Sequence, residues 1–436
     1  MNYTIRFTVP SNVKAIFRSL KYRNYRLFFG GQGISLIGTF MQQVALGWLV
    51  YRLTNSPLLL GIVGFTSQIP IFLFSPFAGV IADKHNRRNM LIITQILSFV
   101  QASILSYLVL SGHMQVWHII ILSAMRGIID SFDMPIRQSF IVEMLENRGD
   151  LGNAIALNSI MINVARLIGP SIGGLLIASA GEGLCFLLNA ISCIPVLISL
   201  LAMKITVQPI KSNGRHVFLE LVEGFRYAFN CAPIRYVLLL VGLSSLAGVP
   251  YQVLMPVFAR DVFHGGANTL GFLLAMTGAG ALVGAVYLAS RKTVFGLKTV
   301  IAVAAGLLGA GLIGFSFSRI LWVSMIILIF SGGGLIVQMA SSNTVLQTLV
   351  EEDKRGRIAS LYIMFYTGIT PFGNLLAGGL TSKIGAPATL FGGGLCCLIG
   401  AILFTIKLPL IREKARDIYV KKGIIPEVAK GIQSAI

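Results

Sequence analysis

The stretch G-V-I-A-D-K-H-N-R-R, from Gly79 to Arg88, lies between two apolar runs, Leu58 to Ala82 and Met90 to Leu110. Each run is long enough to cross a bilayer as a helix, because about 20 apolar residues span the hydrocarbon core. The stretch is therefore a short charged turn between two membrane helices.

Small, acidic and basic residues are combined in this turn. Gly79 stands one helical turn before Asp83, and a small residue there lets a neighbouring helix approach closely. Arg87 and Arg88 follow the acid. The combination favours a polar latch at the cytoplasmic end of a helix bundle. For the basic residues alone, the alternative is that they only mark a cytoplasmic loop.

The composition places the whole chain in a membrane. Of the 436 residues, 55% are hydrophobic and 12% are charged, and the charged share is about half that of soluble domains. The net charge of +19 arises in the gaps between apolar runs, mostly in every second gap. That distribution is topological, so we expect a lipid bilayer and no nucleic acid as the partner.

Cofactor chemistry has no recognisable motif in the sequence. The five cysteines form no C-x-x-C pair and mostly lie in apolar runs, and the five histidines lie in loops or near helix ends. No phosphate-binding glycine loop, H-E-x-x-H or nucleotide motif occurs. We therefore expect no metal, no cofactor and no ATP. The N-terminus also lacks the pattern of a cleaved signal peptide.

Apolar runs predict twelve transmembrane helices, several of them interrupted by Gly or Pro. Lys and Arg concentrate on one side, which we expect to be the cytoplasm, with both termini there. The other side holds only Arg52, Arg260, Arg319 and Lys383. The predicted helices cover about residues 27–51, 57–82, 89–111, 115–134, 152–180, 184–203, 233–259, 268–290, 296–317, 319–342, 356–382 and 386–408.

The longest break in the apolar pattern divides the chain into two halves. It contains an amphipathic stretch, Val217 to Asn230, which predicts a surface helix. The halves repeat weakly: Pro170 and Pro371 lie in glycine-rich helices, and the stretch from Gly280 to Lys292 repeats the opening turn without its acid. Parallel six-helix repeats are typical of transporters. The expected parts are a cytoplasmic amphipathic tail (1–26), an N-terminal six-helix bundle (27–203), a cytoplasmic linker with the surface helix (204–232), a C-terminal six-helix bundle (233–408) and a cytoplasmic tail (409–436).

Three charged residues lie deep inside predicted helices, away from the ends: Arg126, Asp130 and Arg166. A charge at mid-bilayer costs about 2.5–3.5 kcal/mol on insertion scales, so each should face the bundle interior or a wet cavity. Asp130 follows Arg126 by one helical turn, which allows the two to pair. The pair is either a switch that responds to protonation or substrate, or a static pair that offsets two burial costs. Asp130 is the best candidate for a proton carrier.

Neutral polar residues inside the predicted helices are candidate contacts for a small-molecule substrate. For each of them the alternative is an ordinary hydrogen bond between helices. They are Gln42, Gln43, Asn163, Tyr251, Gln252, Gln338, Asn343 and Tyr366.

Three of these features resemble motifs of the major facilitator superfamily. The Gly79–Arg88 turn is similar to G-x-x-x-D-(R/K)-x-G-R-(R/K), with Asn86 replacing a glycine; asparagine tolerates the left-handed backbone that glycine would adopt. Arg126 is similar to the buried arginine of helix 4. The stretch R-L-I-G-P-S-I-G-G resembles a helix 5 motif associated with exporters, although its glycines could serve packing alone. The motif residues after Arg166 are Gly169, Pro170, Gly173 and Gly174.

Longer phrases resemble the branch of enterobactin-type siderophore exporters and macrolide-efflux proteins. They are Y-R-N-Y-R-L-F-F from Tyr22, A-L-G-W-L-V-Y-R-L-T from Ala45, R-G-I-I-D-S-F-D-M-P-I-R-Q from Arg126 and N-A-I-A-L-N-S from Asn153. The resemblance spans about residues 20–408. It implies alternating access around a central cavity and export coupled to inward proton flow.

The same resemblance implies a role for Asp133. That acid would join Asp83, Arg87 and Arg88 in a charge relay that holds the outward-facing state. The alternative for Asp133 is a solvated helix end.

We therefore predict an all-α membrane protein of the major facilitator fold, with twelve transmembrane helices in two six-helix bundles. It would export a bulky organic solute, such as a siderophore or drug, from a bacterial cytoplasmic (inner) membrane by proton antiport, as a monomer. A lysophospholipid flippase or another facilitator is the alternative within this fold. A membrane sensor would need a signalling domain, for which the longest polar segments are too short. An enzyme would need a nucleophile–base or metal set, which we do not find.

Overall fold

The computed structural model describes residues 17–203, 217–291, 293, 296–351 and 354–413. For residues 76, 79–80, 82–84 and 217–222 it describes the backbone course but not the side chains. Most of the two predicted tails and the first part of the predicted linker, 204–216, therefore lie outside the described residues.

The first half of the chain forms six long helices joined by short turns. Ser56 caps α3, where its hydroxyl accepts the Leu59 N–H at 3.3 Å, and Gly181 ends α6 with a φ of 80°. The elements are η1 (Arg18–Lys21), α2 (Arg23–Thr54), α3 (Pro57–Lys84), α4 (Arg87–Leu110), α5 (Val116–Glu143), η2 (Arg148–Asp150), α6 (Leu151–Ala180) and α7 (Glu182–Ala202).

Asn86, in the α3–α4 turn, does not use the left-handed backbone that asparagine tolerates. Its φ is −66°, and its side chain caps α4 by accepting the Asn89 N–H at 3.3 Å. Asparagine is a preferred N-cap residue because its short side chain reaches a free helix N–H. Asn86, which stands where the motif has a glycine, therefore acts as the N-cap of α4.

The described second half contains two helical runs with π turns, η3 and η4 in the first and η6 in the second, each close to a proline. A proline removes one backbone donor, which favours such local rearrangements. The elements are α8 (Val217–Asn230), α9 (Ala232–Leu243), η3 (Ser244–Gly248), α10 (Tyr251–Val257), η4 (Phe258–Val262), α11 (Ala267–Ser290), α12 (Leu297–Phe317), α13 (Leu321–Leu349), α14 (Arg355–Ile363), η6 (Met364–Gly368), α15 (Thr370–Ile384) and α16 (Ala386–Ile406).

Each predicted apolar segment corresponds to a helix or to a run of helical pieces, and the surface helix α8 covers the predicted residues. Ten segments among the described residues are long and apolar enough to cross a membrane. The other two are α5, which carries charges at its centre, and the broken run α14–η6–α15. Helix α5 also continues through Pro135 to Glu143, nine residues past the predicted end at 134.

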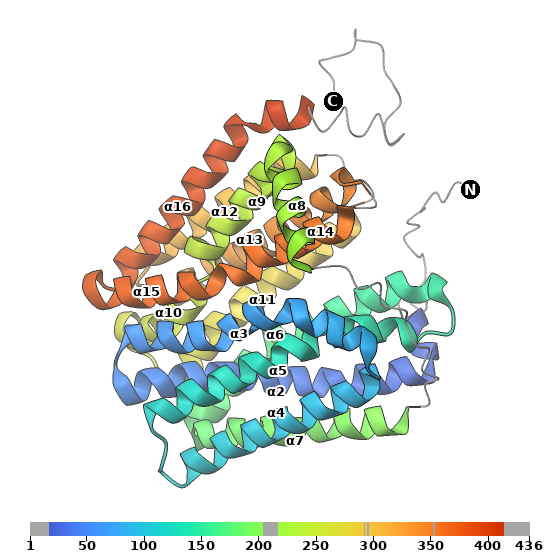
Figure 1. The fold of residues 1–436 in the computed structure, drawn as a ribbon. Helices are drawn as coiled ribbons and strands as arrows, with labels where there is room; N and C mark the ends of the chain where they lie inside the picture. The colour runs from blue at the N-terminus through green and yellow to red at the C-terminus, as the bar shows by residue number, and fades with distance from the viewer. Residues whose placement is uncertain (1–16, 204–216, 292, 294–295, 352–353, 414–436) are drawn as a thin grey trace.

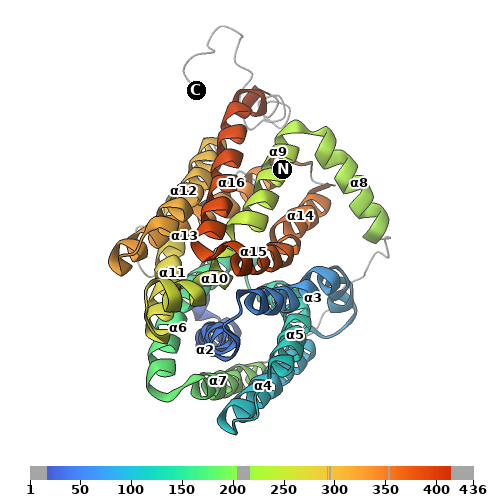
Figure 2. The same cartoon turned by 90° about the vertical axis from the view of Figure 1, so that its left-hand side faces the viewer.

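The helices form two bundles, α2–α7 and α9–α16 (Figures 1 and 2). They meet along two helix pairs, α3 with α15 and α6 with α11. Glycines allow these approaches: a Cβ on Gly378 would lie 2.6 Å from the Pro57 oxygen, and one on Gly174 would lie 2.7 Å from the Ala267 oxygen. Small residues at helix crossings are the usual basis of close packing in membranes.

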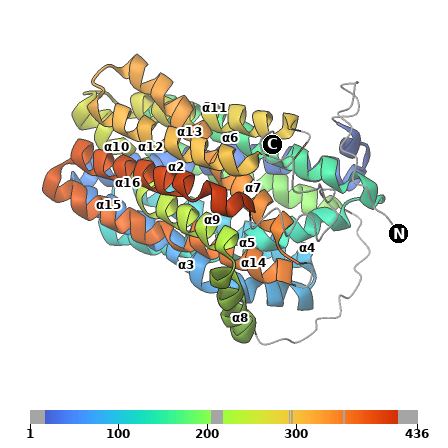
Figure 3. The ribbon, with the colours of Figure 1, turned by 90° about the horizontal axis from the view of Figure 1, so that it is seen from above.

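The two ends of the bundles differ in charge. We call the end that holds Arg87, Arg148, Arg291 and Arg355 the basic end, and the other the opposite end. Helix α8 lies at the basic end beside α14 (Figure 3), where Glu223 and Arg357 form an ion pair of 2.7 Å. In Figure 1 the bundles diverge towards the basic end.

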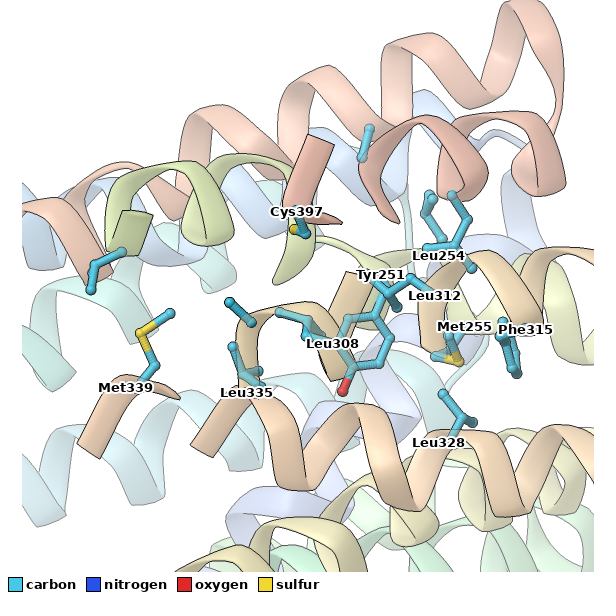
Figure 4. Packing of buried hydrophobic residues seen from close by; sticks show 14 of the residues in the cluster. Tyr251, Leu254, Met255, Leu308, Leu312, Phe315, Leu328, Leu335, Met339 and Cys397 are labelled. Carbon is cyan, nitrogen blue, oxygen red and sulfur yellow. The ribbon is translucent and has the colours of Figure 1, made fainter. Parts of the chain in front are cut away.

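The short η1 turn, near the beginning of the described residues, is held against the first bundle. The Asp150 carboxylate accepts the Tyr22 hydroxyl at 2.7 Å and pairs with Lys21 at 2.9 Å. The hydrogen bond to Asp150 raises the pKa of the Lys21 ammonium. The core of the second bundle is apolar, with Leu254 and Met255 among its buried residues (Figure 4).

Candidate functional site: a cavity between the two bundles

A cavity of about 510 Å³ lies between the bundles and is lined from both of them. Its walls include the middle portions of α2, α3, α5 and α6 on one side and of α10, α11, α13 and α15 on the other. Among the residues that the structure describes, five charged side chains line it, and these come from the first bundle: Arg126, Asp130, Asp133, Arg137 and Arg166.

Four of the five charges form a ladder along one face of α5. Arg126, Asp130, Asp133 and Arg137 follow one another at spacings of four, three and four residues, which place side chains on one helix face. Arg126 Nε donates to Asp130 Oδ2 at 2.9 Å, so the predicted pair is formed. Asp133 pairs with Arg137 in the same i, i+4 register.

The Asp133 carboxylate is held from a second helix. Its Oδ1 accepts the Thr94 hydroxyl at 2.9 Å and the Gln95 amide at 3.2 Å, and the residue is 2% exposed. Asp133 is therefore a buried, multiply bonded carboxylate and not a solvated helix end. We did not predict Arg137 from the sequence, because the predicted helix stopped before it.

The second bundle contributes a neutral wall. Its polar lining residues are Tyr251, Gln252, Thr277, Tyr366 and Asn374. Asn374 is 1% exposed, and neither its amide nitrogen nor its amide oxygen has a hydrogen-bond partner. We did not predict Asn374 either; its position three residues after Pro371 in a predicted membrane helix was the available signal.

Four of the eight predicted substrate contacts line the cavity: Gln43, Tyr251, Gln252 and Tyr366. The other four, Gln42, Asn163, Gln338 and Asn343, do not line it.

Three of the residues away from the cavity make hydrogen bonds inside their own bundle. Gln42 accepts the Asn189 amide at 2.7 Å, Gln338 donates to the Ser244 hydroxyl at 2.7 Å, and Asn163 donates to the Ser159 carbonyl at 2.9 Å. Asn343 is exposed on α13. The bonds of Gln42, Gln338 and Asn163 agree with the alternative of ordinary hydrogen bonds within or between helices.

The motif of transmembrane helix 5 lies on α6 and contacts two neighbouring helices. Gly169 and Gly173 pack against α2, where added Cβ atoms would lie 2.6 Å from Phe40 Cβ and 3.2 Å from Met41 Cα. Gly174 packs against Gly271 of the other bundle, and Pro170 lines the cavity. The motif therefore combines packing with a position at the interface between the bundles.

The three predicted latch residues with described side chains, Arg87, Arg88 and Asp133, bond to separate partners in this conformation. Arg87 Nη1 donates to Glu143 at 2.6 Å, and Arg88 donates to the carbonyls of Leu200 and Leu201 at 2.6 and 2.8 Å. Asp133 bonds with Arg137 instead. The backbone of Gly79 and Asp83 continues α3, and their side chains lie outside the described residues.

Polar contacts between the bundles close the opposite end. The Tyr51 hydroxyl donates to Asp261, and Arg260 Nη1 donates to Asn55 at 2.6 Å. Arg260 also lies over the Tyr51 ring, 5.8 Å from its centre. We did not predict this closure, because Tyr51 and Asp261 are about two hundred positions apart in sequence.

Comparisons with known proteins agree with this architecture. The model of the transmembrane secretion effector family matches residues 15–431. The staphyloferrin A transporter of Staphylococcus aureus is 27% identical over 361 residues, covering 80% of this chain and 88% of that protein. The enterobactin exporter EntS of Shigella boydii is 25% identical over 400 residues, covering 89% and 92%.

A solved structure extends the likeness to the fold. The nucleoside transporter NupG has a TM-score of 0.67 at 12% identity, covering 89% of this chain and 99% of that chain. The predicted multi-pass membrane fold is confirmed.

Proposed function

Because the chain belongs to the transmembrane secretion effector family of the major facilitator superfamily, we propose that it exports a bulky organic solute, a siderophore or a drug, in exchange for protons. The protein is a transporter and not an enzyme. The observation that carries the proposal is the cavity shared by two bundles, charged on one wall and neutral on the other.

The conformation fits one of the two end states of alternating access. If the basic end faces the cytoplasm, as the positive-inside rule predicts, the contacts of Tyr51 with Asp261 and of Arg260 with Asn55 close the outer side. The chain is then in an inward-facing state. Transport requires these contacts to break and the basic end to close, with solute and protons favouring different states.

The Arg126–Asp130 pair would couple protons to this motion. While Asp130 is ionised, Arg126 is neutralised by an ion pair of 2.9 Å. When a proton binds to Asp130, Arg126 loses its counter-charge, and the cavity gains one positive charge. A change of that size within a low-dielectric cavity alters the relative stability of the two states.

The latch would act in the opposite, outward-facing state. When the basic end closes, Asp83, Arg87 and Arg88 at the α3–α4 turn would approach the second bundle, and Asp133 would exchange Arg137 for a new partner. Asp83→Asn should therefore slow transport without unfolding the protein. Full activity of that variant would show that the turn only sets the membrane topology and does not act as a latch.

Export from whole cells tests the proposal. Cells that express the protein should release siderophores or macrolides faster than cells with an empty vector, and an uncoupler should abolish the difference. Release that is indifferent to the uncoupler would contradict proton exchange. Transbilayer movement of lysophospholipid in place of these solutes would favour the flippase alternative.

A further inference from the structure

Among the charges of the cavity, Arg166 has no counter-charge. The lining contains three arginines and two aspartates, and each aspartate is paired with an arginine of α5, Asp130 with Arg126 and Asp133 with Arg137. No carboxylate in the described part of the chain pairs with Arg166. The described cavity therefore carries a net charge of +1 when both aspartates are ionised.

Arg166 lies at the middle of α6, at the contact between the bundles. A Cβ on Gly278 of α11 would come within 2.7 Å of the Arg166 carbonyl oxygen. The guanidinium lies over the Phe40 ring, 5.8 Å from its centre. Stacking occupies a face of the planar group and leaves the N–H donors along its edge available.

Two buried polar residues on the facing wall are also without partners. The Tyr251 hydroxyl has no hydrogen-bond partner although Tyr251 is 1% exposed, and the buried Asn374 amide is likewise unpaired. Tyr251 and Arg166 line the same cavity from opposite bundles. Buried polar groups are normally satisfied, so these groups and the bare guanidinium point to a ligand that carries acceptors.

We propose that the solute is an organic acid anion and that Arg166 binds its carboxylate, with the Tyr251 hydroxyl as a second donor. The inference rests on the proposed export function and narrows its substrate class. Arginine matches a carboxylate because its parallel N–H groups bind both oxygens. A lipophilic cation would be repelled by the same excess charge. The other two arginines of the cavity are already neutralised.

Transport of two dyes by energised proteoliposomes tests this proposal. The probes are calcein, a bulky polycarboxylate, and rhodamine 6G, a bulky cation. Wild-type protein should transport calcein, and Arg166→Gln should lower that transport by at least about tenfold, as expected for loss of a charge-assisted hydrogen bond. Arg166→Lys should retain part of it, because the charge remains. Tyr251→Phe should have a smaller effect, about two- to tenfold.

Arg412→Gln is the matched control. It removes the same charge from an exposed residue of the basic end, whose side chain donates to Thr299 at 2.8 Å outside the cavity. Calcein transport by this variant should equal that of the wild type. Arg166→Gln should also keep its thermal unfolding temperature without solute, because it removes an unpaired charge, and calcein should raise that temperature only in the wild type.

Three results would overturn the proposal, and they can be told apart. Equal calcein transport by wild type and Arg166→Gln would remove Arg166 from the binding site. Transport of rhodamine 6G alone would exclude an anionic substrate while leaving the export function intact. Transport of neither dye would count against the export function and this inference together.

Discussion

The two bundles have the same number of long helical segments but opposite chemistry at the cavity. In the described lining of the cavity, the five charged residues belong to the first bundle, whereas the polar residues of the second are neutral. The turn that corresponds to Gly79–Arg88 in the second half also lacks an acid. Charges inside a membrane are costly and usually mark functional sites. We therefore propose that the first bundle supplies both proton coupling and the carboxylate-binding Arg166, and that the second supplies a neutral wall of the solute site.

The largest effect on transport should come from removing the Arg126–Asp130 ion pair on the charged side of the cavity. Arg126→Ala leaves Asp130 without its ion-pair partner; a fully buried pair loses about 3–5 kcal/mol in this way. The Arg126 and Asp130 side chains are 19% and 25% exposed, so we expect loss of the pair to cost about 1–3 kcal/mol. We expect a decrease in proton-driven transport of the corresponding size, about five- to 150-fold. Rates in proteoliposomes measure it. Wild-type rates from Arg126→Ala would remove the buried pair from the mechanism.

An intermediate effect should come from the surface that the bundles share. A Cβ at Gly378 would lie 2.6 Å from the Pro57 oxygen, whereas one at the neighbouring Gly379 would have its nearest contact at 3.9 Å. Gly378→Ala should therefore disfavour closure of the opposite end, by about 1–3 kcal/mol for overpacking. Gly379→Ala is the matched control.

Spin labels at Leu53 and Lys383, two exposed residues of the opposite end, would report that closure as a distance distribution. We expect Gly378→Ala to shift it to longer distances and Gly379→Ala to leave it unchanged. Identical distributions for the two variants would contradict the close helix contact.

The smallest effect should come from a single hydrogen bond between the bundles. Tyr51→Phe removes the hydroxyl that donates to Asp261. A hydrogen bond of this kind contributes about 0.5–1.5 kcal/mol to the stability of the closed end. The open fraction of the opposite end, measured with the same labels, should rise about two- to tenfold. Tyr107→Phe is the control, because Tyr107 is 70% exposed. No change in the Tyr51 variant would mean that the contact does not hold the end closed.

The sequence predicted the helices well because bilayer length and hydrophobicity act locally. It also predicted the Arg126–Asp130 pair, which depends only on spacing along one helix. It missed Arg137 because the predicted apolar segment ended at 134, yet α5 continues through Pro135 to Glu143. It could not separate Gln43, which lines the cavity, from its neighbour Gln42, which bonds within the first bundle. That choice depends on helix rotation, which tertiary packing sets.

Asp130 is the residue on which proton coupling depends most directly. In proteoliposomes, accumulation of solute driven by a pH gradient can be compared with solute exchange at equal pH, using whichever dye the wild type transports. We predict that Asp130→Asn abolishes the accumulation and retains the exchange, because the alternating bundles remain while the proton site is lost. Accumulation by Asp130→Asn at the wild-type level would contradict coupling through the charged wall of the first bundle.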